Sequence, residues 1–149
     1  MAALLPDSTN HAYDGSLVSA WGLTLLGILT VGPGAIHAFL PDGGAGVIAG
    51  LDLTHNATTI IGVFAWVGAT QIVWGLTMLA VSWRWRSLVP LLLALILVER
   101  LIIALNQWVF KPGDGPDHPP EAYATLVLLP IVALLLALAL KRRQGAASA

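Results

Sequence analysis

Residues 88–110 read LVPLLLALILVERLIIALNQWVF, an apolar run with a glutamate and an arginine near its centre. About 20 apolar residues in a helix cross the hydrocarbon core of a bilayer, so this stretch predicts a membrane span. A charged side chain at membrane depth costs about 3 kcal/mol or more, and it therefore usually faces a partner or a water-filled cavity. Glu99 and Arg100 are for this reason the first candidates for a functional site, including a catalytic one.

The composition extends this prediction to the whole chain. Of its 149 residues, 57% are hydrophobic and only 10% are charged, whereas about a quarter are charged in a soluble domain. The net charge of −1 and the lack of a basic stripe give no indication of nucleic-acid binding. The absence of cysteine excludes disulfides, thiolate metal ligands and a cysteine nucleophile. The sequence therefore predicts a polytopic membrane protein.

Hydropathy and turn residues divide the chain into four predicted spans within one domain. The first sixteen residues lack the basic start and the long apolar run of a signal peptide. Asp14 or Ser16 can cap the first membrane helix, since both side chains accept hydrogen bonds. The expected fold is an all-α, integral membrane four-helix bundle with spans at about 17–40, 57–81, 88–110 and 123–140.

Small residues indicate how the first two spans pack. Pro33, between two glycines, predicts a kink in the first span. Small side chains on one face let another membrane helix approach closely, and a polar residue on such a face can hydrogen-bond across helices. In the first span this face comprises Ala20, Thr24, Gly27, Val31, Gly34 and Ala38. In the second span it comprises Phe64, Gly68, Gln71, Gly75 and Met78.

A helical wheel of residues 88–110 separates the polar side chains into two stripes. Glu99 and Asn106 share one face, and Arg100 and Gln107 share another, about 100° round the helix. Because adjacent residues on a helix do not face each other, we expect Glu99 and Arg100 not to satisfy each other directly.

Each charged residue then needs a partner elsewhere. We expect Glu99 to accept a hydrogen bond from Gln71 or Trp74, or to be protonated. Arg100 needs carbonyls, a carboxylate on another helix, or a neighbouring subunit. Trp66 and Trp74 lie too deep for an interfacial belt, so they pack in the bundle or line a cavity. The predicted ligand-binding residues are Gln71, Trp74, Glu99, Arg100, Asn106 and Gln107.

Histidines and carboxylates gather in segments predicted to lie at one end of the bundle. These residue types suit zinc, iron or copper, but no tight spacing such as HExxH occurs. His37 can equally be an interfacial histidine bonded to a loop carbonyl, and the proline-rich residues 111–121 can equally form an irregular, solvated acidic loop. The metal candidates are His37, Asp52, His55 and His118, on a surface that also includes Asp42, Asp114, Asp117 and Glu121.

Basic residues predict the orientation in the membrane. Arg84 and Arg86 alternate with tryptophans in the turn after the second span, and residues 141–143 are all basic, whereas Lys111 stands alone on the opposite side. Basic residues favour cytoplasmic loops. We therefore expect a multi-pass protein of the cell membrane with both termini in the cytoplasm.

The second span resembles a known group of families. Residues 68–81 read GATQIVWGLTMLAV, similar to the glycine-punctuated second helix of DoxX-like proteins and related small four-helix membrane families of unknown function. The Glu99–Arg100 pair, followed by an apolar run, is similar to the arginine that some members carry in the third helix. The cysteines of thiol-dependent quinone reductases are absent, and the spacing differs from that of MAPEG glutathione enzymes. The resemblance covers residues 21–140 in general layout; it implies a four-helix bundle and transfers no catalytic residue.

The residues leave three functions open, and the first two centre on Glu99. One is a DoxX-like binding or accessory subunit with a polar intramembrane pocket, whose partner is a lipophilic small molecule, another membrane subunit or a second copy of the chain. The other is a membrane enzyme acting on a lipid or quinone, with Glu99 as acid or base and Arg100, Gln71 and Asn106 orienting the substrate.

The third function is a haem or metal protein using His37 with His55 or His118. A haem between helices needs facing histidines within spans, and only His37 lies in a predicted span. The sequence identifies no cofactor.

Overall fold

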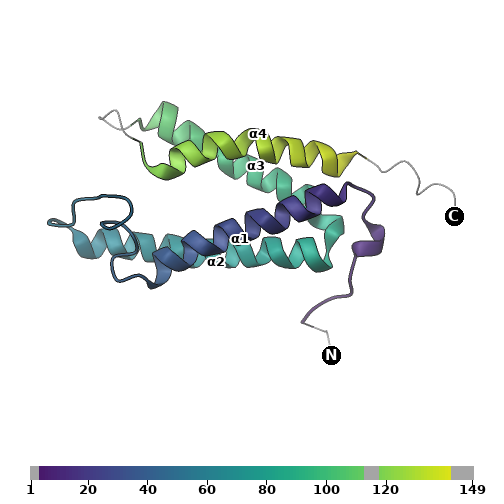
Figure 1. Cartoon of the computed structure of the whole chain (residues 1–149), viewed down its shortest axis with the longest axis horizontal. Coiled ribbons are helices and arrows are strands. Elements are labelled where there is room, and N and C mark those ends of the chain that lie inside the picture. The colour runs from purple at the N-terminus through teal and green to yellow at the C-terminus, as the bar shows by residue number, and fades with distance from the viewer. Residues whose placement is uncertain (1–3, 113–117, 142–149) are drawn as a thin grey trace.

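The chain folds into four long helices. The computed structural model describes residues 4–112 and 118–141, and this part contains helices and no strands. The long helices are α1 (Leu17–Phe39), α2 (Ala57–Arg84), α3 (Val89–Leu105, continued by the π-helical turn η3, Asn106–Phe110) and α4 (Pro120–Leu140). Two 3₁₀ turns, η1 (Asn10–Ala12) and η2 (Arg86–Leu88), precede α1 and α3. Figure 1 shows the resulting bundle, which confirms the predicted all-α fold class.

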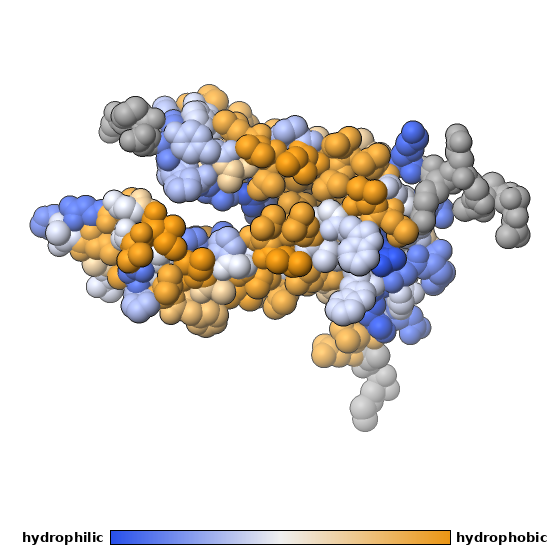
Figure 2. All heavy atoms as spheres, viewed as in Figure 1, coloured by the Kyte–Doolittle hydropathy of each residue, from blue (hydrophilic) through white to orange (hydrophobic). Residues whose placement is uncertain are grey.

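The surface of the bundle is apolar. All four helices are long and apolar enough to cross a bilayer. Large hydrophobic side chains such as Leu25, Leu91 and Leu134 are more than half exposed, and Figure 2 shows apolar residues covering much of the outside. Lipid, not water, is the solvent that suits such a surface. The chain is therefore a multi-pass membrane protein.

The bundle consists of two helical hairpins, α1 with α2 and α3 with α4 (Figure 1). Glycines bring α1 and α2 close together. A Cβ atom added at Gly68 would lie 2.5 Å from the Ala38 nitrogen, and one added at Gly75 would lie 2.8 Å from the Gly27 carbonyl oxygen. Both glycines are buried, as is Gly34 on α1. The small-residue faces predicted from the sequence therefore form the α1–α2 contact. The proline at which a kink was expected, Pro33, does not interrupt α1, which is one continuous helix.

The hydrophobic core occupies one half of the bundle. It takes residues from the first part of α1 and α3 and from the last part of α2 and α4, including Leu23, Met78, Leu93 and Val132. We refer to this half, which ends at the turn between α2 and α3, as the closed half. In the other half, the open half, the two hairpins diverge (Figure 1).

The N-terminal segment ties the two hairpins together at the closed end. The Thr9 amide donates to the Arg84 carbonyl at the end of α2 (3.1 Å), and the Ser16 amide donates to the Leu138 carbonyl near the end of α4 (3.2 Å). The buried Ser19 hydroxyl adds a bond to the Leu135 carbonyl, 2.8 Å away. These hydrogen bonds fix the hairpins to each other where the core is densest.

Two helix ends differ from the expected spans, and one cap is confirmed. The helix α2 continues to Arg84 before the turn begins. The helix α4 begins at Pro120, because a proline fits the first turn of a helix, where its missing N–H would have no helical partner. Ser16 caps α1 by accepting a hydrogen bond from the Val18 amide at 3.2 Å, as expected.

Candidate functional site

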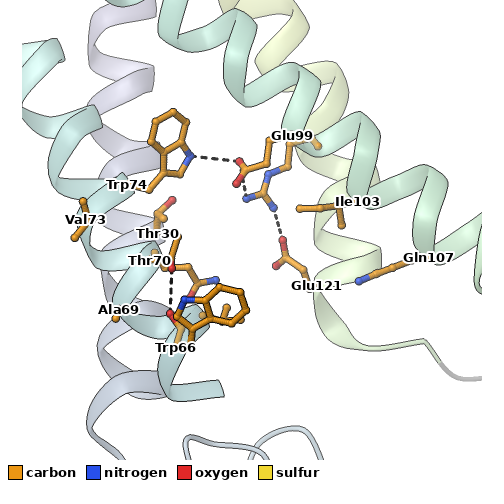
Figure 3. Close-up of a pocket in the computed structure, with 13 residues that line it drawn as sticks. Thr30, Trp66, Ala69, Thr70, Val73, Trp74, Glu99, Ile103, Gln107 and Glu121 are labelled. Atoms are coloured by element: carbon orange, nitrogen blue, oxygen red, sulfur yellow. Dashed lines mark hydrogen bonds and ion pairs between the residues drawn. The ribbon is translucent and has the colours of Figure 1, made fainter. Parts of the chain in front are cut away.

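A cleft lies between the two hairpins in the open half. It has a volume of about 830 Å³, and Figure 2 shows it as a hollow with hydrophilic residues along its floor. All four helices contribute side chains, and α2 and α3 contribute most of them (Figure 3). The lining residues are Thr30, Trp66, Val67, Ala69, Thr70, Gln71, Val73, Trp74, Glu99, Arg100, Ile103, Gln107 and Glu121.

Arg100 lies between two carboxylates, and we refer to Glu99, Arg100 and Glu121 as the ion cluster. One guanidinium nitrogen, Nη1, forms an ion pair with Glu121 Oε1 on α4. The other, Nη2, lies 3.5 Å from Glu99 Oε2 (Figure 3). The expectation that Glu99 and Arg100 do not contact each other was wrong. The arginine side chain is long enough to bring its terminal atoms back beside the neighbouring carboxylate while it also reaches across to α4.

The three members of the ion cluster differ in exposure. The Arg100 side chain is 12% exposed, whereas Glu99 is 38% and Glu121 is 46% exposed. All three residues line the cleft, and the arginine is the least accessible of them. With two acids and one base among its lining residues, the cleft carries a formal charge of −1.

Two tryptophans of α2 form the wall opposite the ion cluster (Figure 3). The indole N–H of Trp74 donates to Glu99 Oε2 at 3.4 Å, which confirms one of the two donors expected for this carboxylate. Trp66 is 72% exposed, so most of its ring surface is accessible. The cleft therefore has an aromatic side, formed by the two indoles, and an acidic side, formed by the carboxylates of the ion cluster.

Of the three side-chain amides predicted to bind a ligand, Gln71 and Gln107 line the cleft and Asn106 does not. Gln71 and Gln107 line the cleft, and the side-chain oxygen of each is buried without a hydrogen-bond partner in the described part of the chain. Asn106 is not among the lining residues, and its amide donates to the Ile102 carbonyl at 2.9 Å. Asn106 itself has α-helical backbone angles (φ −63°, ψ −46°), and the π-helical turn changes the angle between successive side chains only beyond it. The amide that lines the cleft at this end of α3 is therefore Gln107, from the stripe of Arg100, and not Asn106, from the stripe of Glu99.

A second cavity of about 430 Å³ adjoins the cleft on the side of α1 and α4. It shares Thr30, Gln71, Arg100 and Glu121 with the cleft. The remaining lining residues are mostly apolar, such as Leu29 on α1. Arg100 and Glu121 thus line both cavities, whereas Glu99 lines the cleft and not the second cavity.

Glu121 was missed as a site residue. The sequence reading placed it in an irregular acidic loop, but it lies in the first turn of α4 and reaches Arg100. Proline followed by an acidic residue is a typical helix start, because an acid interacts favourably with the N-terminal end of the helix. This signal at Pro120 and Glu121 could have identified the carboxylate that Arg100 needs.

Two of the histidines expected at the end of the bundle have local partners. The His37 Nδ1–H donates to the Gly43 carbonyl at 2.7 Å, which confirms the expected bond to a loop carbonyl, and its ring meets Phe64 edge-on. His118 stacks on Trp108 with ring centroids 4.0 Å apart. His55 is exposed.

The carboxylates of this region bind backbone amides. Asp42 accepts hydrogen bonds from the amides of Val47, Gly44 and Gly46, and these bonds hold the pKa of its carboxyl below the usual value. Asp52 accepts from the Thr54 amide at 2.8 Å, which lowers the pKa of Asp52.

No group of three or more histidine, aspartate or glutamate side chains is placed to hold a metal ion within residues 4–112 and 118–141. Asp114 and Asp117 lie outside the described residues.

Comparison with known proteins yields no relative from which a function could be transferred. No protein-family model matches the chain, and neither a curated protein nor a solved structure matches it.

Proposed function

We propose that this chain is a small DoxX-like membrane protein that binds a lipophilic molecule with a polar head in the cleft, as a binding or accessory subunit. The observation that carries the proposal is the ion cluster at the wall of a cleft of about 830 Å³. Ligand pockets have volumes of about 300–1,000 Å³ and combine an apolar lining with a few placed polar groups. This cleft has that size and that combination.

The surroundings of the ion cluster support the same function. Ion pairs at membrane depth are expensive and are retained at ligand or ion pathways. Glu99 lies well inside the third candidate span, which the structure gives as Arg86–Phe110. The cleft and its adjoining cavity open between the hairpins, so a molecule dissolved in the bilayer can reach the cluster from the side. The positions of Arg84, Arg86 and Lys141 support a cell-membrane orientation with both termini in the cytoplasm.

Mass spectrometry of the intact protein released from mild detergent tests this proposal. Ile103 projects into the cleft from α3 (Figure 3), whereas Ile102 is 56% exposed and does not line the cleft. The variant Ile103→Trp places a bulky side chain in the cleft beside the ion cluster and is expected to lose copurifying molecules that the wild type retains. Ile102→Trp, the same change one residue earlier, is expected to keep them. Equal retention by both variants would exclude binding in the cleft.

A second candidate function is a membrane enzyme acting on a lipid or quinone. The contacts of Glu99 with Trp74 and Arg100 favour it, because they orient a carboxylate that is still 38% exposed to the cleft. In this case Glu99→Gln should stop the conversion of a membrane lipid extract, followed by mass spectrometry, while the protein keeps its unfolding temperature. Conversion at the wild-type rate would reject Glu99 as acid or base.

A further inference from the structure

We infer that the head group recognised in the cleft is an organic monocation, an amine or a quaternary ammonium that carries an apolar chain. This inference rests on the proposed function and specifies the class of ligand. It follows from the charge of the lining, from the order in which a ligand meets the charged groups, and from the tryptophan wall.

The first step is the charge. Glu99 and Glu121 both contact Arg100, and no other basic residue is among those that line the cleft. One guanidinium therefore serves two carboxylates in a part of the protein where an uncompensated charge is costly. A ligand with a single positive charge, together with Arg100, neutralises the two negative charges of Glu99 and Glu121.

The second step is the access to these groups. The guanidinium is 12% exposed and contacts both acids, so an anionic head would first meet the more exposed carboxylates and would have to displace one of them. A cation meets the carboxylate oxygens directly. The side-chain oxygen of Gln71, buried without a partner in the described structure, adds an acceptor for an ammonium N–H.

The third step is the tryptophan wall. A cation over the face of an indole is attracted by the negative face of the ring, and tryptophan is the best aromatic partner for it. Trp66 and Trp74 face the acidic side of the cleft (Figure 3), and Trp66 is 72% exposed. Val67 and Ile103 line the same cleft and suit an apolar chain. An inorganic ion or a proton would supply the charge but would leave the indoles and the apolar lining without a role.

Calorimetry with the full chain in nanodiscs of a zwitterionic lipid tests the inference. Three probes share a twelve-carbon chain and differ in the head group, and each is used below the concentration at which it unfolds the protein: dodecyltrimethylammonium, dodecanol and dodecyl sulfate. Heats measured with empty nanodiscs are subtracted. We expect the cation to bind about tenfold more tightly than the alcohol, because Coulomb attraction to the two carboxylates and cation–π contacts with the indoles add to the same apolar burial. The sulfate is expected to bind no better than the alcohol.

Matched variants show which residues recognise the charge. Glu99→Gln and Glu121→Gln are each expected to weaken binding of the cation about tenfold while binding of dodecanol changes little. Glu121→Asp keeps the charge and is expected to restore binding if Glu121→Gln proves unstable. Trp66→Leu should weaken binding of the cation severalfold. Trp83→Leu, on an 81% exposed tryptophan outside the cleft, should not.

The outcomes separate the two proposals. If the alcohol or the sulfate binds the wild type as tightly as the cation, and Ile103→Trp abolishes this binding, the inference about the head group is wrong and the binding function stands. If sodium or protons, but not dodecyltrimethylammonium, change the tryptophan fluorescence in a Glu99-dependent way, the site is one for an inorganic ion and the inference is again wrong. If no probe binds and Ile103→Trp retains the same molecules as the wild type, the binding function fails as well.

Discussion

Replacing Arg100 by glutamine leaves two carboxylates without their shared partner. An exposed ion pair contributes about 0–1 kcal/mol to stability, whereas breaking a buried pair costs about 3–5 kcal/mol. Arg100 is close to the buried case at 12% exposed, and Glu99 and Glu121 are partly screened at 38% and 46%. The loss for Arg100→Gln therefore lies between these limits, at about 2 kcal/mol.

The double variant Arg100→Gln/Glu121→Gln sharpens this prediction. Glu121→Gln alone leaves Arg100 with Glu99 and should cost about 1 kcal/mol. In the double variant the repulsion between the acids is also gone, so the total loss should stay near 2 kcal/mol instead of the sum. Residues in direct contact are coupled by about 0.5–3 kcal/mol, and a coupling of about 1 kcal/mol is expected here.

Titration of sodium dodecyl sulfate into the protein in mild detergent, followed by tryptophan fluorescence, gives the free energies of unfolding. Arg86→Gln is the control, since Arg86 donates to the Ser82 carbonyl at 3.0 Å and forms no ion pair in the described structure. Two results would refute the reasoning. One is additivity of the single losses to within about 0.5 kcal/mol, and the other is a loss for Arg100→Gln no larger than that of the control.

Two further predictions concern packing and pH. Gly68→Ala should lower the free energy of unfolding by at least about 2 kcal/mol, because the new Cβ would meet the backbone of α1 at 2.5 Å. Gly62→Ala is the control on the same helix, where the new Cβ would have no neighbour within 4 Å. It should raise the free energy of unfolding by about 0.5–1 kcal/mol in the same titration. A similar loss of stability for both variants would contradict the close approach of α1 and α2. Asp42 has a pKa held below its usual value by backbone amides, so its contribution to stability is present above the ordinary aspartate pKa and disappears as the pH falls through the lowered one. The difference in unfolding temperature between the wild type and Asp42→Asn should therefore shrink as the pH falls below about 4, and a constant difference would show that the amide bonds do not depend on the charge.

The sequence predicts the spans and the α1–α2 contact because these depend on local patterns. An apolar run longer than about 20 residues fixes a span, and glycines on one face such as Gly34 fix a close helix pair. The involvement of Trp74 with Glu99 was also predictable, since both are polar groups at the same depth in neighbouring spans.

The parts of the site that the sequence does not predict depend on how the two hairpins are placed relative to each other. Glu121 reaches Arg100 because α4 starts at Pro120, which the proline and the acid signal, and because α4 lies beside α3, which no periodicity in either segment encodes. Asn106 shares a predicted helical face with Glu99 but does not line the cleft, because the extent of the cleft along α3 depends on how the hairpins are placed. The cleft itself exists because the hairpins diverge, and this is a property of tertiary packing.

The concentration of the core in the closed half has a consequence for evolvability and for engineering. Among the lining residues of the cleft, Trp74 packs against the core cluster, and the Thr30 hydroxyl contacts two of its members, the Leu26 carbonyl at 2.8 Å and the Met78 sulfur at 4.0 Å. Apolar lining positions such as Val67 and Ile103 belong neither to the core cluster nor to the ion cluster. On the proposed function, substitutions there can alter ligand selectivity without removing contacts within either cluster, so these positions on α2 and α3 are suitable for combinatorial libraries.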